Sequence, residues 1–155
     1  MKSLIIYDSL FGNTEKIAQA IAKGIGENAK TIGITNAAPS DVASVDLLIV
    51  GTPTHGGRPS QRMKQWLTTI ASDGLKNKKV ATFDTGIPTE GQKGFIRLVI
   101  RFFKYASPRL ANILASKGAK ILASETFFVL GKEGPLKEGE LERAELWGGK
   151  ITRQL

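Results

Sequence analysis

The sequence predicts an α/β fold, a three-layer doubly wound sheet of five parallel strands with helices on both faces. Apolar runs of strand length alternate along the chain with segments of helical periodicity, which is typical of parallel strands joined by crossovers. These runs are mostly apolar on both faces, as expected for strands covered by helices on each side. The predicted strands are residues 3–7, 30–35, 47–51, 79–83 and 121–129. The predicted helices lie near residues 13–26, 60–72, 93–116 and 139–153.

The first strand and the first helix show the clearest patterns. Residues 4–7 form a continuous apolar run. The apolar residues that follow recur at the spacing of one helix face: Ile17, Ala18, Ile21, Ala22 and Ile25. Residues 36–44 leave room for little more than one turn of helix. No internal repeat or linker interrupts the alternation, so we expect a single domain over residues 1–155.

The helical segment 93–116 carries a basic stripe. Its cations recur every three or four residues and therefore share one helix face: Lys93, Arg97, Arg101 and Lys104. The net charge of +8 comes from the middle of the chain as a whole, because residues 51–118 hold twelve basic and only three acidic side chains. A solvated basic surface is one interpretation. Docking to an acidic partner protein or to an anionic membrane surface is the other.

The composition excludes several classes of protein. The chain has no cysteine, which rules out disulfides and thiolate chemistry, and its single histidine argues against a metal site. No apolar run is long enough to span a membrane, and we expect no secretory signal. A cytoplasmic location fits these features. No aromatic and basic surface for nucleic acid is apparent, so no nucleic-acid partner is expected.

Three loops should meet at one edge of the predicted sheet. In doubly wound folds, ligands bind beyond the carboxyl ends of the strands, which here places residues 8–14, 51–60 and 84–92 together. The first of these loops lies between a strand and a helix start, where unpaired N–H groups and the helix dipole favour an anion. Gly12 permits the tight curvature that such a loop needs. The alternative is a plain helix cap by Asn13 or Thr14.

Together the three loops resemble those of the flavodoxin family. The family's phosphate loop, Ser/Thr-x-Thr-Gly-x-Thr, corresponds here to residues 9–14, Ser-Leu-Phe-Gly-Asn-Thr. The second loop, residues 51–57, and the third, residues 84–91, are similar to their family counterparts, as is the ending from Gly134 to Gly148. The fifth strand has no long insertion, which resembles the short-chain form. The resemblance implies the strand order 2-1-3-4-5.

The resemblance implies a cofactor, FMN, bound without a covalent link. It assigns the cofactor-binding site to Ser9, Phe11, Gly12, Asn13, Thr14, Thr52, Pro53, Thr54, His55, Gly56, Gly57, Asp84, Thr85 and Gly86. Ser9, Asn13 and Thr14 would hold the phosphate with the loop N–H groups. Phe11 stands where the family usually has a hydroxyl, so one side-chain donor is missing.

The ring contacts implied by the resemblance are less specific. His55 matches a stacking position, or is a solvated loop histidine; Gly56-Gly57 matches a peptide that flips on reduction, or is an ordinary tight turn. Backbone N–H groups of Thr85 and Gly86 would bind the pyrimidine edge. Asp84 would either accept a hydrogen bond from the cofactor or shape the turn. Trp66 and Phe95 are expected to be core or helix-packing residues.

The function implied is electron transfer, with FMN cycling through quinone, semiquinone and hydroquinone. A carrier of this kind needs redox partner proteins and no catalytic residue of its own. The alternative is an FMN-dependent oxidoreductase of the same fold, such as a quinone reductase or a protoporphyrinogen oxidase-like enzyme, which the basic and apolar segment 93–105 favours. A third, non-redox interpretation is a flavin-free interaction domain, since fold alone does not fix function.

Overall fold

The computed structural model describes residues 1–89, 93–95 and 105–155. Its five strands form one parallel sheet in the order β2-β1-β3-β4-β5, which confirms the predicted fold class and strand order. The strands are β1 (Ser3–Tyr7), β2 (Ala29–Gly33), β3 (Leu47–Pro53), β4 (Lys79–Gly86) and β5 (Lys120–Phe128). The helices are α1 (Asn13–Ile25), α2 (Pro39–Ala43), α3 (Gln61–Thr68), α5 (Ala106–Ser116) and α6 (Glu140–Thr152), with a 3₁₀ turn, η1, at Ile34–Asn36.

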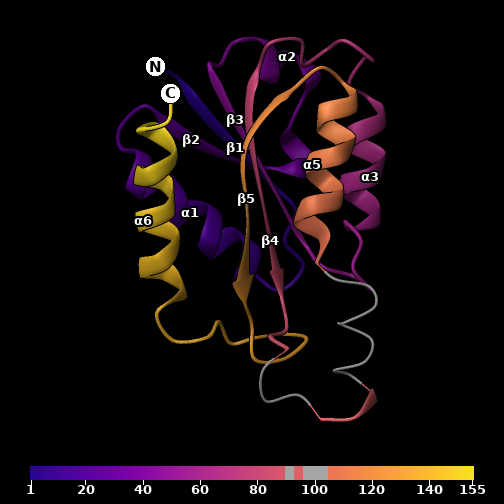
Figure 1. The fold of residues 1–155 in the computed structure, drawn as a ribbon, viewed down its shortest axis with the longest axis vertical. Coiled ribbons are helices and arrows are strands. Elements are labelled where there is room, and N and C mark those ends of the chain that lie inside the picture. Colours follow the sequence, from indigo (N-terminus) through magenta and orange to yellow (C-terminus); the bar gives the residue numbers. More distant parts are fainter. Residues whose placement is uncertain (90–92, 96–104) are drawn as a thin grey trace.

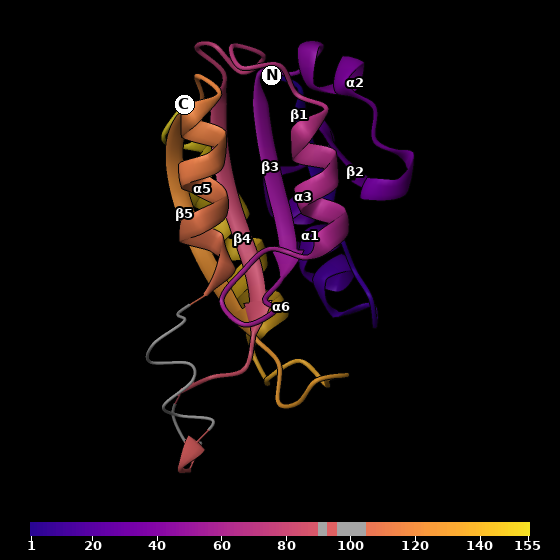
Figure 2. The ribbon, with the colours of Figure 1, turned by 90° about the vertical axis from the view of Figure 1, so that its right-hand side faces the viewer.

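Helices cover both faces of the sheet, and each face has its own apolar core. Figures 1 and 2 show α1 and α6 on one face and α3 and α5 on the other. The α1 and α6 face packs around Phe83, Phe127 and Trp147, whose rings meet edge to face. The opposite face packs around Met63, Trp66 and Leu110. The central strand β3 is fully buried over Leu47–Val50, because it lies between both cores. This arrangement holds the carboxyl ends of β1, β3 and β4 rigidly side by side.

The prediction of a continuous helix over residues 93–116 was wrong in the position at which the helix begins. Tyr105 has an extended backbone (φ −104°, ψ 160°), and α5 begins only at Ala106. Three of the four stripe cations, Arg97, Arg101 and Lys104, lie outside the described residues. Phe95 is described and is 78% exposed, so it is not the packing residue expected from the sequence. Trp66 is buried, and its indole N–H donates to the carbonyl of Ala37, which confirms its core role.

The first helix begins at a glycine. Gly12 is the N-cap of α1 with a left-handed backbone (φ 90°), and as a glycine it offers no side-chain cap. The alternative of a cap by Asn13 or Thr14 is therefore not what the chain adopts. Over the described ranges, no helix has the length and apolarity needed to cross a membrane.

Candidate functional site

A cavity of about 460 Å³ opens at the carboxyl ends of the strands, within the range typical of cofactor sites. The three predicted loops converge on it. Nine of the predicted residues line its walls: Ser9, Phe11, Asn13, Thr14, Pro53, Thr54, His55, Thr85 and Gly86. The other five, Gly12, Thr52, Gly56, Gly57 and Asp84, lie in the same loops without lining this cavity.

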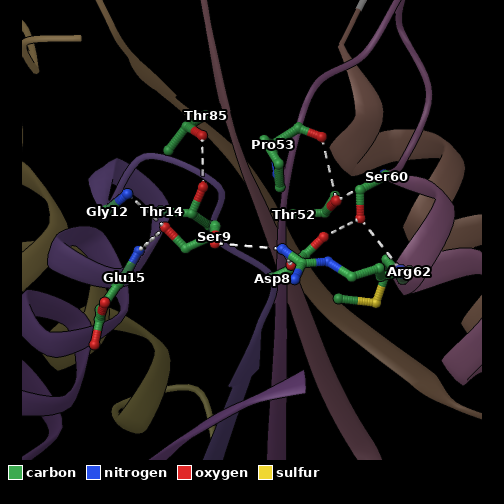
Figure 3. Close-up of polar contacts among 11 residues, drawn as sticks. Asp8, Ser9, Gly12, Thr14, Glu15, Thr52, Pro53, Ser60, Arg62 and Thr85 are labelled. Carbon is green, nitrogen blue, oxygen red and sulfur yellow. Dashed lines mark hydrogen bonds and ion pairs between the residues drawn. The ribbon is translucent and has the colours of Figure 1, made fainter. Parts of the chain in front are cut away.

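The loop from Ser9 to Thr14 presents backbone donors at the start of α1. The Ser9 hydroxyl accepts hydrogen bonds from the N–H groups of Gly12 (3.1 Å) and Glu15 (3.3 Å), and so fixes the loop against the helix (Figure 3). In the described part of the chain, no oxygen accepts from the N–H groups of Asn13 and Thr14. Both residues are buried. Unpaired N–H groups at a helix N-terminus form a site for an anion.

The hydroxyl and amide groups of this loop retain donors for a ligand. The Thr14 and Thr85 hydroxyls lie 2.8 Å apart. Their shared hydrogen bond uses one of their two protons, which leaves the other free to donate. The Asn13 amide donates to the Glu133 carbonyl (3.0 Å) and keeps a second N–H. Ser9 acts only as an acceptor within the loop, so its own proton is available.

The second loop is a two-residue hairpin turn. His55 and Arg58 exchange backbone hydrogen bonds of 2.9 and 3.0 Å around Gly56 and Gly57. Both glycines have positive φ angles, 57° and 74°, as a type I′ turn requires. His55 lines the cavity at the base of this hairpin, and its side chain is exposed. An imidazole in that position is available to a flat ligand.

Asp84 is fully buried beneath the second loop. Its carboxylate accepts hydrogen bonds from the hydroxyl of Thr54, the hydroxyl of Thr126 (2.7 Å) and the first N–H of α5, at Ala106 (3.0 Å). Burial raises the pKa of Asp84 to about 6, although these hydrogen bonds lower it. These contacts to the protein's own groups favour the interpretation in which Asp84 shapes the turn.

The third loop is held from outside by Tyr105. The Tyr105 hydroxyl donates to the Ile87 carbonyl (3.0 Å), and its ring lies against Gly86, where a Cβ would come within 2.9 Å of it. Residues 90–92 of this loop lie outside the described ranges. Tyr105 therefore fixes the path of the chain just after β4.

A fourth segment, which follows β5, completes the cavity. Val129, Gly131 and Lys132 line it, as do Leu10 and Ile87 of the predicted loops. Sequence reasoning missed this segment as a wall, although the glycines of residues 131–134 and the chain reversal they allow were a usable signal. Lys132 adds a positive charge beside the cavity.

The rim of the cavity is apolar and basic. Three large apolar side chains around it are exposed: Leu10 (57%), Phe11 (44%) and Leu130 (55%). The exposed Arg58 lies on the hairpin. Arg62 is also near, but it forms an ion pair with Asp8 (2.5 Å), which offsets its charge. Arg58 and Lys132 are therefore the cations of the rim whose charge is not offset by a described ion pair.

Comparisons with known proteins agree with one another. A family model described as flavodoxin matches residues 5–147. The chain is 25% identical to a flavodoxin of Clostridium saccharobutylicum, over 100% of this chain and 98% of that protein. It is 28% identical to flavodoxin 1 of Escherichia coli K12, over 97% of this chain and 93% of that protein. The crystal structure of oxidised flavodoxin 1 from Bacillus cereus, 22% identical, shares the fold with a TM-score of 0.76 over 100% of this chain and 99% of that one.

Proposed function

The chain belongs to the flavodoxin family, and from this premise we propose which of its residues serve an FMN-binding, electron-transferring protein. The redox chemistry that FMN supplies when bound is the uptake and release of one or two electrons. The residues present fit this cofactor. The observation that carries the proposal is that Asn13 and Thr14, two buried residues that line the cavity, have N–H groups with no acceptor among the described residues.

The phosphate end of the site is the loop before α1. The N–H groups of Asn13 and Thr14, with the spare donors of Ser9, Asn13 and Thr14, would hold a phosphate dianion through charge-assisted hydrogen bonds. The positive end of the helix dipole adds to the attraction. Phe11 contributes a partly exposed ring to the wall in place of a hydroxyl, so the backbone carries more of the binding here.

The ring end of the site lies between the second and third loops. His55, Pro53 and Ile87 line this part of the cavity, and Lys132 lines it as well. The turn at Gly56 and Gly57 is exposed at Gly56 and free of side chains, which suits a peptide that changes its orientation with the redox state.

Flavodoxins act with redox partner proteins, and we propose that the partners of this chain are acidic. The exposed cations Arg58 and Lys132 and the exposed apolar residues Leu10, Phe11 and Leu130 lie on the loops that form the cavity. Charge of one sign around an apolar centre favours a partner of opposite charge and speeds its approach. An anionic membrane surface is the other candidate, but its main support, segment 93–105, lies mostly outside the described residues. A cytoplasmic location and a single domain stay predictions.

An anaerobic reductive titration of the FMN-loaded protein tests the carrier role. We expect a one-electron form on the way to full reduction, and electron delivery to a one-electron acceptor protein. We expect no turnover of NAD(P)H with a quinone unless a separate reductase is added. Turnover without a reductase would support the FMN-dependent oxidoreductase instead, which the comparisons do not favour.

A further inference from the structure

Two buried carboxylates hold the ends of the second loop, and they come from the two strands that flank β3. Asp8 follows β1 and Asp84 lies in β4, on either side of the central strand. Asp84 pairs with Thr52 in the sheet, and Asp8 directly follows the Tyr7–Gly51 pair. The carboxylates are 3% and 0% exposed. They lie at one level of the sheet beneath the loop that leaves β3.

The far end of the loop is held at Ser60. The Ser60 hydroxyl donates to Asp8 (2.5 Å), while the Ser60 N–H donates to the Thr52 hydroxyl (3.0 Å), as Figure 3 shows. The same hydroxyl accepts from Met63 N–H (3.2 Å) and caps α3. Arg62 pairs with the other oxygen of Asp8. We call Ser60 with Asp8 the second anchor.

The near end of the loop is held at Thr54. The Thr54 hydroxyl donates to Asp84, and the Thr54 N–H donates to the Thr85 carbonyl (2.9 Å). The Thr54 oxygen also accepts from Ala106 N–H (3.1 Å), so this end is joined to α5 as well as to β4. We call Thr54 with Asp84 the first anchor.

Between the anchors the loop is held only weakly. In the described structure, the hydrogen bonds of residues 55–58 are the two backbone bonds that His55 and Arg58 exchange. His55, Gly56 and Arg58 are exposed. A Cβ placed on Gly56 would meet nothing within 4 Å. The turn therefore has room to reorient at Gly56, whereas Gly57 is buried and both ends of the loop are fixed to the sheet.

We propose that Asp8 and Asp84 are positioning residues that confine redox-linked rearrangement of the second loop to the turn at Gly56 and Gly57. The inference rests on the proposed function, because it concerns the loop beside the flavin. Fixed ends limit the loop to few conformations. The free-energy difference between the two turn orientations then changes the potential of a single redox step. When an anchor is released, the loop can rearrange in every redox state. The loop then no longer stabilises the one-electron form relative to the oxidised and the fully reduced forms.

The experiment releases each anchor in the FMN-loaded full chain. Ser60→Ala removes the second anchor and Thr54→Val the first; Ser60→Thr and Thr54→Ser are the matched rescues. Thr82→Val is the control, because the buried Thr82 hydroxyl of β4 bonds Ser107 and Ser124 and touches neither carboxylate nor the loop. We expect the peak fraction of the one-electron form to fall at least twofold in both anchor variants, and to be unchanged in the control and restored in the rescues.

Hydrogen exchange of the apoprotein supplies a second readout. We expect the amides of Thr54 and Ser60 to be protected and those of His55 and Arg58 to exchange quickly. Each anchor variant should speed exchange at its own end of the loop at least tenfold. Uniform exchange across residues 54–60, or an unchanged one-electron fraction in both anchor variants, overturns the proposal. Failure of the wild-type chain to bind FMN overturns the proposed function instead, so the two failures are distinguishable.

Discussion

The hydroxyls of Thr14 and Thr85 lie 2.8 Å apart and join the first turn of α1 to the end of β4. This contact links the phosphate loop to the third loop across 71 residues of sequence. Both side chains are buried and both residues line the cavity (2% and 5% exposed). The spacing of the two hydroxyls therefore sets the width of the site at the start of α1.

Removing the Thr14 hydroxyl should weaken phosphate binding. Thr14→Val deletes a donor to a charged group, which is worth about 1.5–3 kcal/mol, so we expect the Kd for FMN to rise by about one to two orders of magnitude. Riboflavin, which has no phosphate, should bind the variant and the wild type equally well. Calorimetric titration with both ligands measures this. An equal loss for riboflavin would show that the site itself had collapsed.

The charge of Lys132 should strengthen FMN binding in a salt-dependent way. Lys132 lines the cavity, so Lys132→Gln should raise the Kd at low ionic strength and much less at high ionic strength, because salt screens the interaction. Lys120→Gln is a matched control, since Lys120 is exposed and opens β5 at the opposite end of the sheet. Equal effects of the two substitutions would show that only net charge matters.

The stability of the apoprotein should decrease as the pH rises through the range in which Asp84 titrates. Burial raises the pKa of Asp84 from 3.8 to about 6, so the folded chain holds this proton more tightly than the unfolded chain. The contribution of Asp84 to the free energy of unfolding therefore falls between about pH 4 and pH 6 and stays low above that range. The difference corresponds to about 3 kcal/mol.

Urea unfolding of the wild type and of Asp84→Asn between pH 4 and pH 8 measures this contribution. Other carboxylates titrate in both proteins, so the difference between the two curves isolates Asp84. We expect the variant to lack the decrease that the wild type shows between pH 4 and pH 6. Parallel curves would mean that Asp84 titrates at its ordinary pKa.

We expect that Gly56 is required in the turn of the second loop because of its positive φ angle, and not because a side chain would lack space there. Gly56→Ala places a side chain at φ 57°, where the surroundings are open but the backbone is strained, at a cost of about 1 kcal/mol. Asn tolerates this conformation, so Gly56→Asn should cost less. Denaturant unfolding gives the stabilities, and the reductive titration should show a smaller one-electron fraction for Gly56→Ala. If the one-electron fraction of Gly56→Ala equals that of the wild type, Gly56 has no role in stabilising the one-electron form.

Most of the fold followed from the sequence because its signals are local. Apolar runs and the 3.6-residue period of Ile17 and Ile21 indicate strands and helices without knowledge of contacts. The start of α5 did not follow, because its first N–H is capped by Asp84, a residue of another element 22 positions away. A helix boundary set by a tertiary contact leaves no local signal at Tyr105.

Only part of the site could be predicted from the sequence, because some of its features are local patterns and others depend on contacts between distant segments. The loop at Gly12 has a recognisable pattern, whereas the wall around Lys132 is formed only when β5 is placed beside β4. The roles of Thr52 and Asp84 could not be read from sequence either. Both are polar residues at strand ends, and only their burial and their partners show that they support the loop rather than face the cavity.

The most direct test of this account is calorimetric titration of the apoprotein with FMN and with riboflavin. We predict one FMN bound per chain, and binding of riboflavin weaker by more than about 100-fold, because the N–H groups of Asn13 and Thr14 each contribute about 1.5 kcal/mol or more to recognition of the phosphate. Absence of FMN binding, or equal affinities for the two ligands, would contradict the assignment of the phosphate site.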